Sequence, residues 1–400
     1  MIKSHAALLL ALTCVAFGAP GKGSFADRIT SRDYPSVFQA WNPIDQPEQF
    51  PLSTNGARLK AAAKHDVLWE EPISQLGFKT ELVLGAVWDH TYPGLASQFT
   101  QASHKLAISN RTELLRMNPN MVFLFEVRWR DAPGSFLPEN STFWKRDSSG
   151  KRVLGWDNGP EPYYLLNPDN PGFQANIARQ CKAALASGVY DGIMFDWSGH
   201  EEIIRQTREA IGNNGLIIVN IHDDIEDAQN FKAWINGAFM ECNPNGPGQP
   251  TSSNQGNWDR LRAGYLYHEQ HLRWPQLNCL EVWGDRKDLR RMRAATTLTL
   301  THGNGSVLFA DPNPLPAPDH LHAWYGFWDV ELGKPKGGRI DRPDGLAQRE
   351  FAGGTVLYNH FGNGTTTVRF EQPRRRISSG EVGTVFTLQD ADGDIFVQPR

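Results

Sequence analysis

Several common sequence features are scarce or absent here, and each absence removes a class of function. Cysteine occurs only four times in 400 residues. Three remain once a leader holding Cys14 is removed, and an odd number excludes a complete disulfide framework. The sequence has no low-complexity tract, phosphate-binding loop, serine-hydrolase elbow or zinc-protease motif. It therefore lacks the signatures of P-loop nucleotide-binding proteins, serine hydrolases and zinc proteases.

The three remaining cysteines stand at positions 181, 242 and 279. Cys242 and Cys279 fall on strand-like runs that we expect to be neighbours, so one disulfide between them is an alternative. We favour free buried thiols, because unpaired cysteine is among the most buried residue types. No cysteine lies in a motif with a paired histidine, so a cysteine nucleophile has little support.

An excess of basic charge is also missing. Lys and Arg number 40 against 44 Asp and Glu, and the one tight basic cluster, 374–376, is too short to follow a nucleic-acid backbone. The sequence therefore predicts no nucleic-acid partner. The 13 Trp residues suit a protein that stacks sugar rings on aromatic faces, with core packing as the alternative for most of them.

Long apolar runs are limited to the N-terminus. Lys3 precedes the apolar run 6–17, and small residues follow it, which is the pattern of a secretory signal peptide. We predict a signal over 1–18, a mature chain from Ala19, and a secreted or periplasmic protein without a membrane span. A lipid anchor on Cys14 is the alternative, although Thr13 fits that motif poorly.

Strand-like runs alternate with helical stretches through most of the chain. The predicted strands are 36–41, 66–70, 121–127, 192–197, 216–222, 237–242, 278–283 and 305–310. The clearest predicted helix is 171–187, with Asn170 as its cap; others are 201–211, 228–234 and 288–300. Eight strands in such an order predict an α/β fold, a (β/α)8 TIM barrel over 30–344. Long loops at 131–170 and 312–335 are expected to shape a binding site.

The pattern of apolar and polar residues changes near residue 345. Short alternating runs at 354–359, 365–370, 382–388 and 394–398 are separated by Gly, Asn-Gly and Asp-Gly turns. They predict a small antiparallel β-sandwich domain over 345–400 that packs on the barrel. The acidic run 390–394 superficially resembles a calcium loop, but the acid required at the twelfth position would be residue 401. We interpret it as a hairpin turn.

Two of the predicted strands end in a carboxylate, Asp196 and Glu241. Residues at the C-terminal ends of barrel strands form the active site, and two converging acids are what cleavage of a glycosidic bond requires. Helix capping by Asp196 and a structural ion pair of Glu241 are the alternatives. Glu126 and Glu281 also close strand-like runs; either could replace one of the pair, although Glu126 is better suited to pair with Arg128.

Other polar and aromatic residues at strand ends are predicted to hold the sugar. The substrate-binding residues that we predict, including the two further acids, are Trp41, Glu126, Trp197, Asn220, His222, Glu281, Trp283 and Asp311. Asp311 is followed by Pro312 and could instead shape its loop. His222 with Asp223 could alternatively bind a metal, although the spacing matches no strong metal motif. His320 and His322 stand two apart in a predicted loop, and we interpret them as hydrogen-bonded loop histidines rather than ligands.

The sequence resembles the hypothetical glycoside-hydrolase-like barrels that border the α-galactosidase and polygalactosaminidase families. The segments that carry the resemblance are 38–41, 118–120, 144–151, 190–197 and 236–241, of which Asp-Gly-x-x-x-Asp-Trp, 191–197, is the most specific. The similarity covers most of 30–400. In such families a fourth-strand Asp is paired with a sixth-strand acid, which implies Asp196 and Glu241 here. The better-studied α-galactosidases have Asp at the second position, where this chain has Glu.

Together these observations predict a secreted glycoside hydrolase that cleaves an oligo- or polysaccharide without a cofactor or a metal. Asp196 would be the nucleophile, or the base if the enzyme inverts, and Glu241 the general acid/base. A carbohydrate-binding protein on an enzyme-like barrel is one alternative, since it would keep the aromatic residues without needing both acids. Metal-assisted hydrolysis at His222 and Asp223 is the other.

Overall fold

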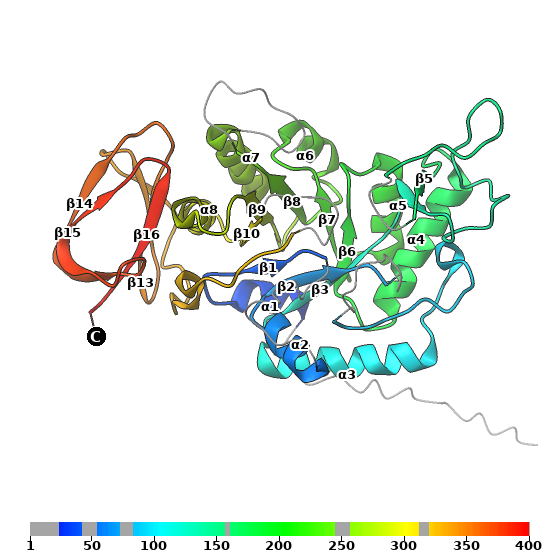
Figure 1. Cartoon of the computed structure of the whole chain (residues 1–400), viewed down its shortest axis with the longest axis horizontal. Coiled ribbons are helices and arrows are strands. Elements are labelled where there is room, and N and C mark those ends of the chain that lie inside the picture. Colours follow the sequence, from blue (N-terminus) through cyan, green and yellow to red (C-terminus); the bar gives the residue numbers. More distant parts are fainter. Residues whose placement is uncertain are drawn as a thin grey trace, which may run out of the picture.

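The computed structural model describes residues 24–41, 54–72, 83–156, 161–244, 257–311 and 320–399. The predicted signal peptide and Cys14 lie outside these ranges. Two parts lie side by side, a barrel and a C-terminal sheet (Figure 1). Among the described residues, no helix has the length and apolar character needed to cross a membrane.

The barrel is a ring of eight parallel strands in the order β1-β2-β3-β6-β7-β8-β9-β10. They are β1 (Phe38–Gln39), β2 (Val67–Glu70), β3 (Val122–Glu126), β6 (Gly192–Phe195), β7 (Leu216–Asn220), β8 (Gly237–Cys242), β9 (Cys279–Trp283) and β10 (Ser306–Ala310). A parallel bridge between Val37 and Val307 closes the ring. The TIM-barrel prediction is confirmed, and every predicted strand is present within two residues at each end.

Helices connect the strands and cover the outside of the barrel. They are α2 (Asn55–Ala62), α3 (Gln101–Met117), α4 (Pro171–Ala186), α5 (Glu201–Ile211), α6 (Ile225–Phe231), α7 (Trp258–His271) and α8 (Leu289–His302), with α1 (Phe25–Ser31) before β1. As predicted, the Asn170 side chain accepts hydrogen bonds from the N–H groups of Gly172 and Phe173, and Pro171 opens α4.

A buried ion cluster closes the N-terminal end of the barrel. Asp191, directly before β6, accepts a hydrogen bond from the Phe123 N–H at 3.1 Å. It also pairs with Arg111 at 2.8 Å and with Arg28 of α1. The charges of these groups compensate one another away from solvent, and removal of one partner would leave a buried charge unpaired. The opposite end, where the strands terminate, carries the chemistry that a barrel offers.

The strand interiors are apolar and buried, and the thiols belong to this packing. In the register of β8 with β9, Cys279 lies opposite Phe239, whereas Cys242 lies opposite Val282. The two thiols are thus three positions apart along the strands, beyond the reach of a disulfide. Cys181, Cys242 and Cys279 are free and buried, which confirms the favoured interpretation.

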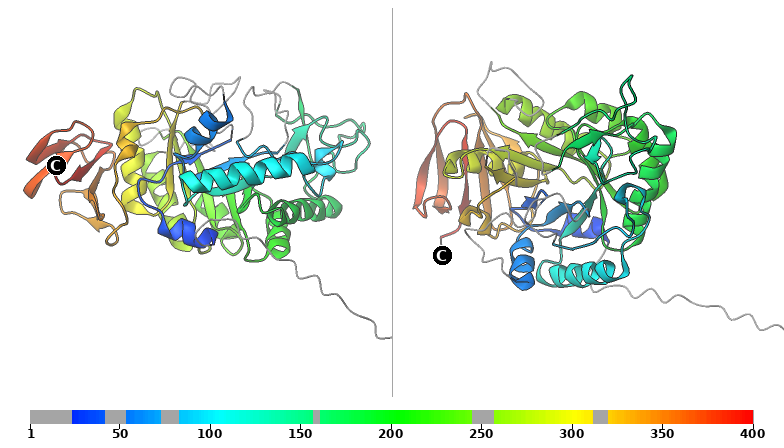
Figure 2. Two further views of the ribbon diagram at one scale, coloured as in Figure 1. Left: turned by 90° about the horizontal axis from the view of Figure 1, so that it is seen from below. Right: turned by 45° about the vertical axis from the view of Figure 1, so that its right-hand side comes forward.

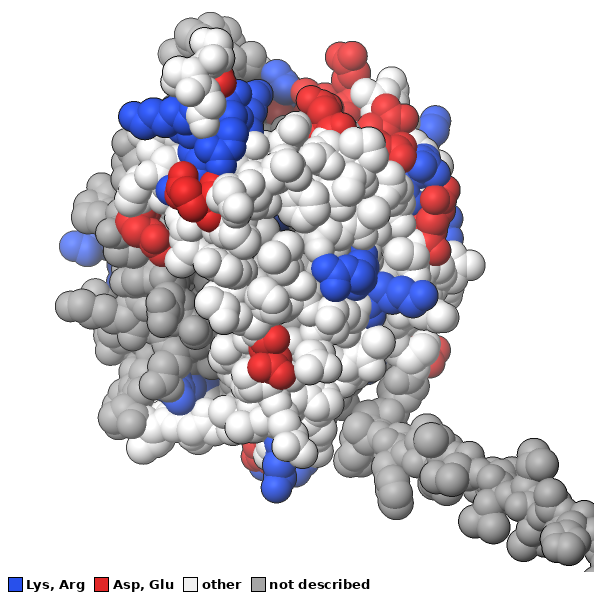
Figure 3. Space-filling model, turned by 90° about the vertical axis from the view of Figure 1, so that its right-hand side faces the viewer, with Lys and Arg blue, Asp and Glu red and all other residues white. Residues whose placement is uncertain are grey.

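The long loop after β3 forms an extension above the barrel. It includes the two-stranded sheet of β4 (Asp131–Pro133) and β5 (Tyr163–Leu165). The extension and α4 lie at the end of the molecule away from the C-terminal sheet (Figure 1). Where the structure describes this end, most of its surface is uncharged, and the charged side chains form small separate groups (Figure 3).

The C-terminal part is an antiparallel sheet of six strands in the order β11-β12-β13-β16-β14-β15. They are β11 (Ile340–Asp341), β12 (Leu346–Glu350), β13 (Gly354–Asn359), β14 (Thr366–Arg376), β15 (Val382–Leu388) and β16 (Asp392–Val397). The antiparallel β domain is confirmed, and its first strand begins just before residue 345. The sheet lies against the side of the barrel in every view (Figures 1 and 2).

The sheet uses both of its faces for packing. One face packs on the barrel, where Val356, Tyr358 and Ile395 join the barrel core. The other face carries a second, smaller apolar core that belongs to the C-terminal part alone and includes Leu357, Phe386 and Phe396. A Cβ on Gly393 would lie 1.9 Å from Thr297 Oγ1 of α8, so only glycine allows this close approach.

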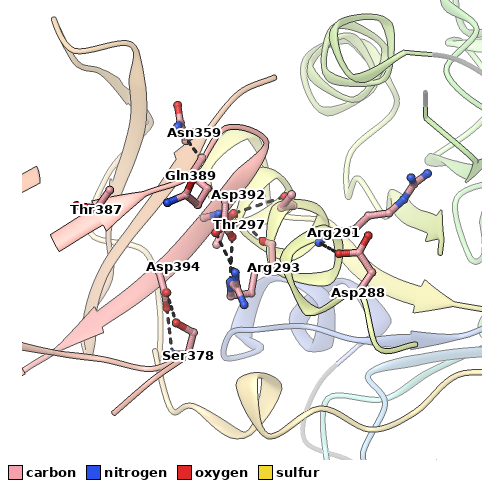
Figure 4. A network of polar contacts seen from close by, with 12 residues as sticks. Asp288, Arg291, Arg293, Thr297, Asn359, Ser378, Thr387, Gln389, Asp392 and Asp394 are labelled. Atoms are coloured by element: carbon pink, nitrogen blue, oxygen red, sulfur yellow. Dashed lines mark hydrogen bonds and ion pairs between the residues drawn. The ribbon is translucent and has the colours of Figure 1, made fainter. Parts of the chain in front are cut away.

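Two acidic residues of β16 hold the C-terminal sheet together and attach it to the barrel. Asp392 makes two hydrogen bonds of 2.9 Å with Arg293 of α8 (Figure 4). Asp394 pairs with Arg376 and accepts the N–H of Ser378 at 3.2 Å. Asp390 accepts hydrogen bonds from the N–H groups of Gly362 and Gly364. The run 390–394 is therefore part of a hairpin, as predicted, and all three of its carboxylates have structural partners.

Candidate active site

Two carboxylates and one amide occupy the centre of the barrel mouth. Asn220, at the end of β7, donates hydrogen bonds from its Nδ2 atom to Asp196 Oδ1 and to Glu241 Oε2, each at 2.9 Å. A primary amide has two N–H groups, and here each one serves a different acid. The predicted pair is thus brought together, with Asn220 between its members.

The shared donor fixes the separation of the acids. Two oxygens that each lie 2.9 Å from one nitrogen are no more than about 6 Å apart. Asp196 and Glu241 are largely enclosed, and each retains a small exposed area. A ligand entering the mouth can therefore reach both carboxyl groups.

The surroundings of the two acids differ. Burial raises the pKa of Glu241 to about 8, and the charges of Glu281 and Asp196 add to this effect against His320 and Asn220. Burial also raises the pKa of Asp196, opposed by the Asn220 hydrogen bond and the charge of Arg128. Near neutral pH Glu241 is mainly protonated. An acid in that state can donate a proton.

Strained backbone is concentrated around this pair. Among the described residues, six other than glycine have positive φ, and five of them belong to the mouth: Trp41, Trp197, Ser198, His222 and His320. Such conformations cost about 1–3 kcal/mol each and cluster at functional sites. The sixth, Ala391, lies in the hairpin before β16. The distribution marks the mouth as the place where the fold tolerates strain.

A network of charges flanks Asp196 on the side of β2 and β3. Arg128 makes two hydrogen bonds of 2.8 Å to Glu71 and lies 3.6 Å from Glu126. The predicted pairing of Glu126 with Arg128 is thus present, although Glu71 is the stronger partner. Trp41 donates its indole N–H to Glu126 and packs edge-on against Trp69. Glu126 is accordingly placed to orient Trp41.

A second charged pair lies on the other side of Glu241. Glu281 of β9 is directly opposite Glu241 in the strand register and is fully buried. Its two carboxylate oxygens lie 2.9 and 3.0 Å from Nδ1 of His320. The His320 ring stacks obliquely on Trp41, with centroids 4.8 Å apart. His320 therefore contacts residues of the site, and these hydrogen bonds agree with its interpretation as a hydrogen-bonded loop histidine rather than a metal ligand.

Trp197 forms the exposed rim beside Asp196. Its side chain is 43% exposed, and the Arg130 guanidinium lies 3.8 Å from the ring centroid. Trp129 donates its indole N–H to the main-chain oxygen of Asp196 at 2.6 Å. These contacts hold the turn after β6, and they leave an aromatic surface open at the mouth.

His222 supports Glu241 from below. Its Nδ1 atom lies 2.9 Å from the main-chain oxygen of Glu241, and burial lowers its pKa. Asp223 pairs with Arg260 at 3.1 Å, and Asp224 caps α6. The carboxylates next to His222 in the chain thus have other partners. Within the described ranges, no group of three or more His, Cys, Asp or Glu side chains could hold a metal ion.

Trp283 and Asp311 complete the predicted set. Trp283 follows Glu281 by two positions and so points to the same side of β9, and its buried indole N–H has no hydrogen-bond partner among the described residues. Asp311 is held by Arg286, with two contacts of 3.1 Å. That ion pair agrees with the loop-shaping role that was its alternative.

Glu71 and His320 were not predicted from the sequence as residues of the site. Arg128 was predicted only as the ion-pair partner of Glu126. A signal for Glu71 existed, because the run Val67-Leu68-Trp69-Glu70-Glu71 ends in acids like the other strands that supply the site. His320 lies in a long loop, and no pattern in the sequence connects it with Glu281. Only the closed ring of strands places the two side chains together.

Comparison with known proteins supports the fold. No protein-family model matches the sequence, and no curated protein matches it. Similar solved structures include a maltogenic α-amylase from Thermotoga neapolitana (TM-score 0.53, 9% identity, 91% of this chain and 99% of that one). An α-amylase from Malbranchea cinnamomea has a TM-score of 0.53 and 13% identity, over 94% of this chain and 97% of that one. An α-amylase from Geobacillus thermoleovorans has a TM-score of 0.51 and 12% identity, over 94% of this chain and 99% of that one. At such identities the similarity establishes the fold alone.

Proposed function

We propose that this protein is a secreted glycoside hydrolase that cleaves an oligo- or polysaccharide with retention of anomeric configuration. The observation that carries the proposal is the contact of one Asn220 nitrogen with both Asp196 and Glu241. Retaining enzymes hold their carboxyl groups about 5–5.5 Å apart and inverting enzymes about 6.5–9.5 Å. An upper limit of about 6 Å favours the first class. The similar structures named above are α-amylases, which agrees with an oligo- or polysaccharide substrate.

The roles follow from the two environments. Glu241, with a pKa near 8, would protonate the glycosidic oxygen while an Asp196 oxygen attacks the anomeric carbon, and the leaving sugar departs with the proton. Glu241, now ionised, would then take a proton from water, whose oxygen displaces Asp196 from the sugar. Arg128 and Asn220 favour the ionised form of Asp196 that this attack requires.

Unpartnered polar atoms suggest how the sugar is held. Asn220 Oδ1 and the indole N–H of Trp283 are buried without hydrogen-bond partners in the described chain. Buried polar groups without partners are costly, and sugar hydroxyls could satisfy both. Trp41 and Trp197 would offer ring surfaces, while Glu126 and Glu281 would act mainly through Trp41 and His320.

The test is a screen of aryl glycosides and of α- and β-linked oligosaccharides, followed by NMR of the first product anomer. Asp196→Asn and Glu241→Gln keep side-chain volume, and each should lower turnover by about a hundredfold or more. Asp169→Asn and Glu201→Gln, both exposed, are matched controls that should retain activity. Near-wild-type turnover by either folded site variant would refute the role of that residue. Sugar binding without turnover by the wild type would instead support a carbohydrate-binding protein.

Secretion is part of the proposal and has its own test. Expression in a secreting host, with mass spectrometry of the exported protein, should give a chain that begins near Ala19. A diacylglycerol on Cys14, or an intact Met1 retained in the cell, would contradict it.

A further inference from the structure

The buried Glu281–His320 contact has the features of a charged pair. Glu281 has no exposed surface, and the partner that the described structure gives its carboxylate is Nδ1 of His320. A buried carboxylate needs a compensating charge or several hydrogen bonds. With Nδ1 facing both oxygens, that nitrogen carries a proton.

The chain places His320 in a demanding position. Its φ of 61° is in the left-handed region, where residues other than glycine are uncommon. The ring packs against Trp41 and Phe239, with centroids 4.8 and 6.0 Å away. An aromatic face stabilises a cation placed over it. The positive φ and the aromatic contacts together hold the His320 ring in one place at the barrel mouth.

The pair is adjacent to Glu241, because Glu281 lies directly opposite Glu241 in the register of β8 with β9. The charge of His320 lowers the pKa of Glu241 and that of Asp196, and the charge of Glu281 raises the pKa of Glu241. The other charged or titratable groups that face these residues come from several elements: Glu71 after β2, Glu126 on β3, Arg128 after β3, Asp196 after β6 and His222 after β7.

We propose that Glu281 and a positively charged His320 form a positioning pair that sets at which pH Glu241 gives up its proton. The inference builds on the proposed function, in which Glu241 is the general acid. His320 would stabilise the ionised form of Glu241, and Glu281 would oppose that effect in part while holding His320 in its charged form. Neither residue would react with the sugar itself.

The test is spectroscopic and needs no substrate. Difference infrared spectra between a protein and its Glu241→Gln variant isolate the C=O stretch of protonated Glu241. Recorded between about pH 5 and about pH 10, they give the midpoint of its ionisation. We expect this midpoint near 8 in the wild type. His320→Asn, which keeps a donor and suits positive φ, should raise it by about one pH unit or more, because a nearby positive charge is lost.

Two further variants make the result specific. Adding Glu281→Gln to His320→Asn removes both charges and should return the midpoint to within about half a unit of the wild type. His271→Asn makes the same exchange at an exposed position of α7, away from the barrel mouth, and should leave the midpoint in place. His320→Gln provides a second measurement if the Asn variant does not fold.

An unchanged or lower midpoint in the folded His320 variants would overturn the inference, whatever the enzyme assays show. Where the substrate screen identifies turnover, the alkaline limb of the pH–rate profile should move upward with the spectroscopic midpoint. A protein that shows the predicted infrared shifts but hydrolyses nothing would leave the pair intact and refute the proposed function.

Discussion

Asp196 and Glu241 receive hydrogen bonds from the same nitrogen atom, Nδ2 of Asn220, at equal distances of 2.9 Å. This contact ties the spacing of the two acids to the position of one side chain at the end of β7. Each carboxyl group is also pushed toward its neutral form by burial. The hydrogen bonds from the Asn220 amide partly offset this rise in pKa for both Asp196 and Glu241.

Replacing Asn220 with Ala should therefore disturb position and proton affinity together. We expect kcat/KM to fall about 10- to 100-fold, since misplacement of catalytic groups by about 1 Å costs up to this much. Loss of the hydrogen bond should raise the pKa of Glu241 further, so the alkaline limb of the pH–rate profile should move upward. Asn213→Ala, at an exposed contact with Arg273, is the control. A profile displaced downward would contradict the role given to Asn220.

Glu241 should also destabilise the folded protein as the pH rises. Its pKa is about 8 in the folded protein and about 4.3 in an unfolded chain, so between these values the folded state binds more protons. Stability contributed by the neutral form is present below about pH 4 and is lost as the pH rises toward 8. At pH 8, Glu241→Gln should stabilise the protein by on the order of 1–3 kcal/mol.

Denaturant unfolding at about pH 5 and about pH 8 measures this effect, with the exposed Glu201→Gln as control. The stabilising effect of Glu241→Gln should shrink at the lower pH. An equal effect at both values would show that Glu241 is not held protonated in the folded protein.

The barrel was predictable because its strands are short apolar runs separated by helices with clear caps and stops, as α4 and its cap Asn170 illustrate. Asp196 and Glu241 were predictable because parallel strands bring their C-terminal ends to one mouth. The contact of His320 with Glu281 was not predictable, because the two residues are 39 positions apart and no pattern in the sequence links them. The link from Trp41 to Glu126 depends on barrel closure.

A buried histidine pair should make the fold sensitive to acid. His65 and His322 lie with Nε2 atoms 3.0 Å apart, and burial lowers the pKa of both, to about 4 for His322. Below about pH 6.5 these two histidines bind more protons in the unfolded chain than in the folded chain. The free energy of unfolding should therefore fall as the pH falls toward 4.

His322→Gln removes one of these titrating groups. Between about pH 6.5 and about pH 4.5 the variant should lose less stability than the wild type, by on the order of 2 kcal/mol, in denaturant unfolding. His271→Gln, at an exposed position of α7, should follow the wild type. Parallel stability curves for His322→Gln and the wild type would count against this account.

The C-terminal sheet should be a structural part of the barrel. Asp392 is fully buried beneath its ion pair with Arg293, so Arg293→Ala leaves an unpaired charge and should cost about 2–4 kcal/mol of stability. Arg290→Ala, on the exposed side of the same helix, should have little effect. A chain of residues 19–345 should aggregate, because the barrel residues under β13 and β16 become exposed. A soluble, active barrel together with a sheet that binds polysaccharide alone would make the sheet a binding module.

The most direct test of the central claim is to trap the covalent intermediate. A 2-deoxy-2-fluoro glycosyl donor of the sugar that the substrate screen identifies slows hydrolysis of the glycosyl-enzyme, and peptide mass spectrometry locates the attached sugar. We expect one sugar, attached to Asp196 in the wild type and absent from the Asp196→Asn variant. Attachment to Glu241 or another acid, or turnover that yields an inverted product with no adduct, would contradict it.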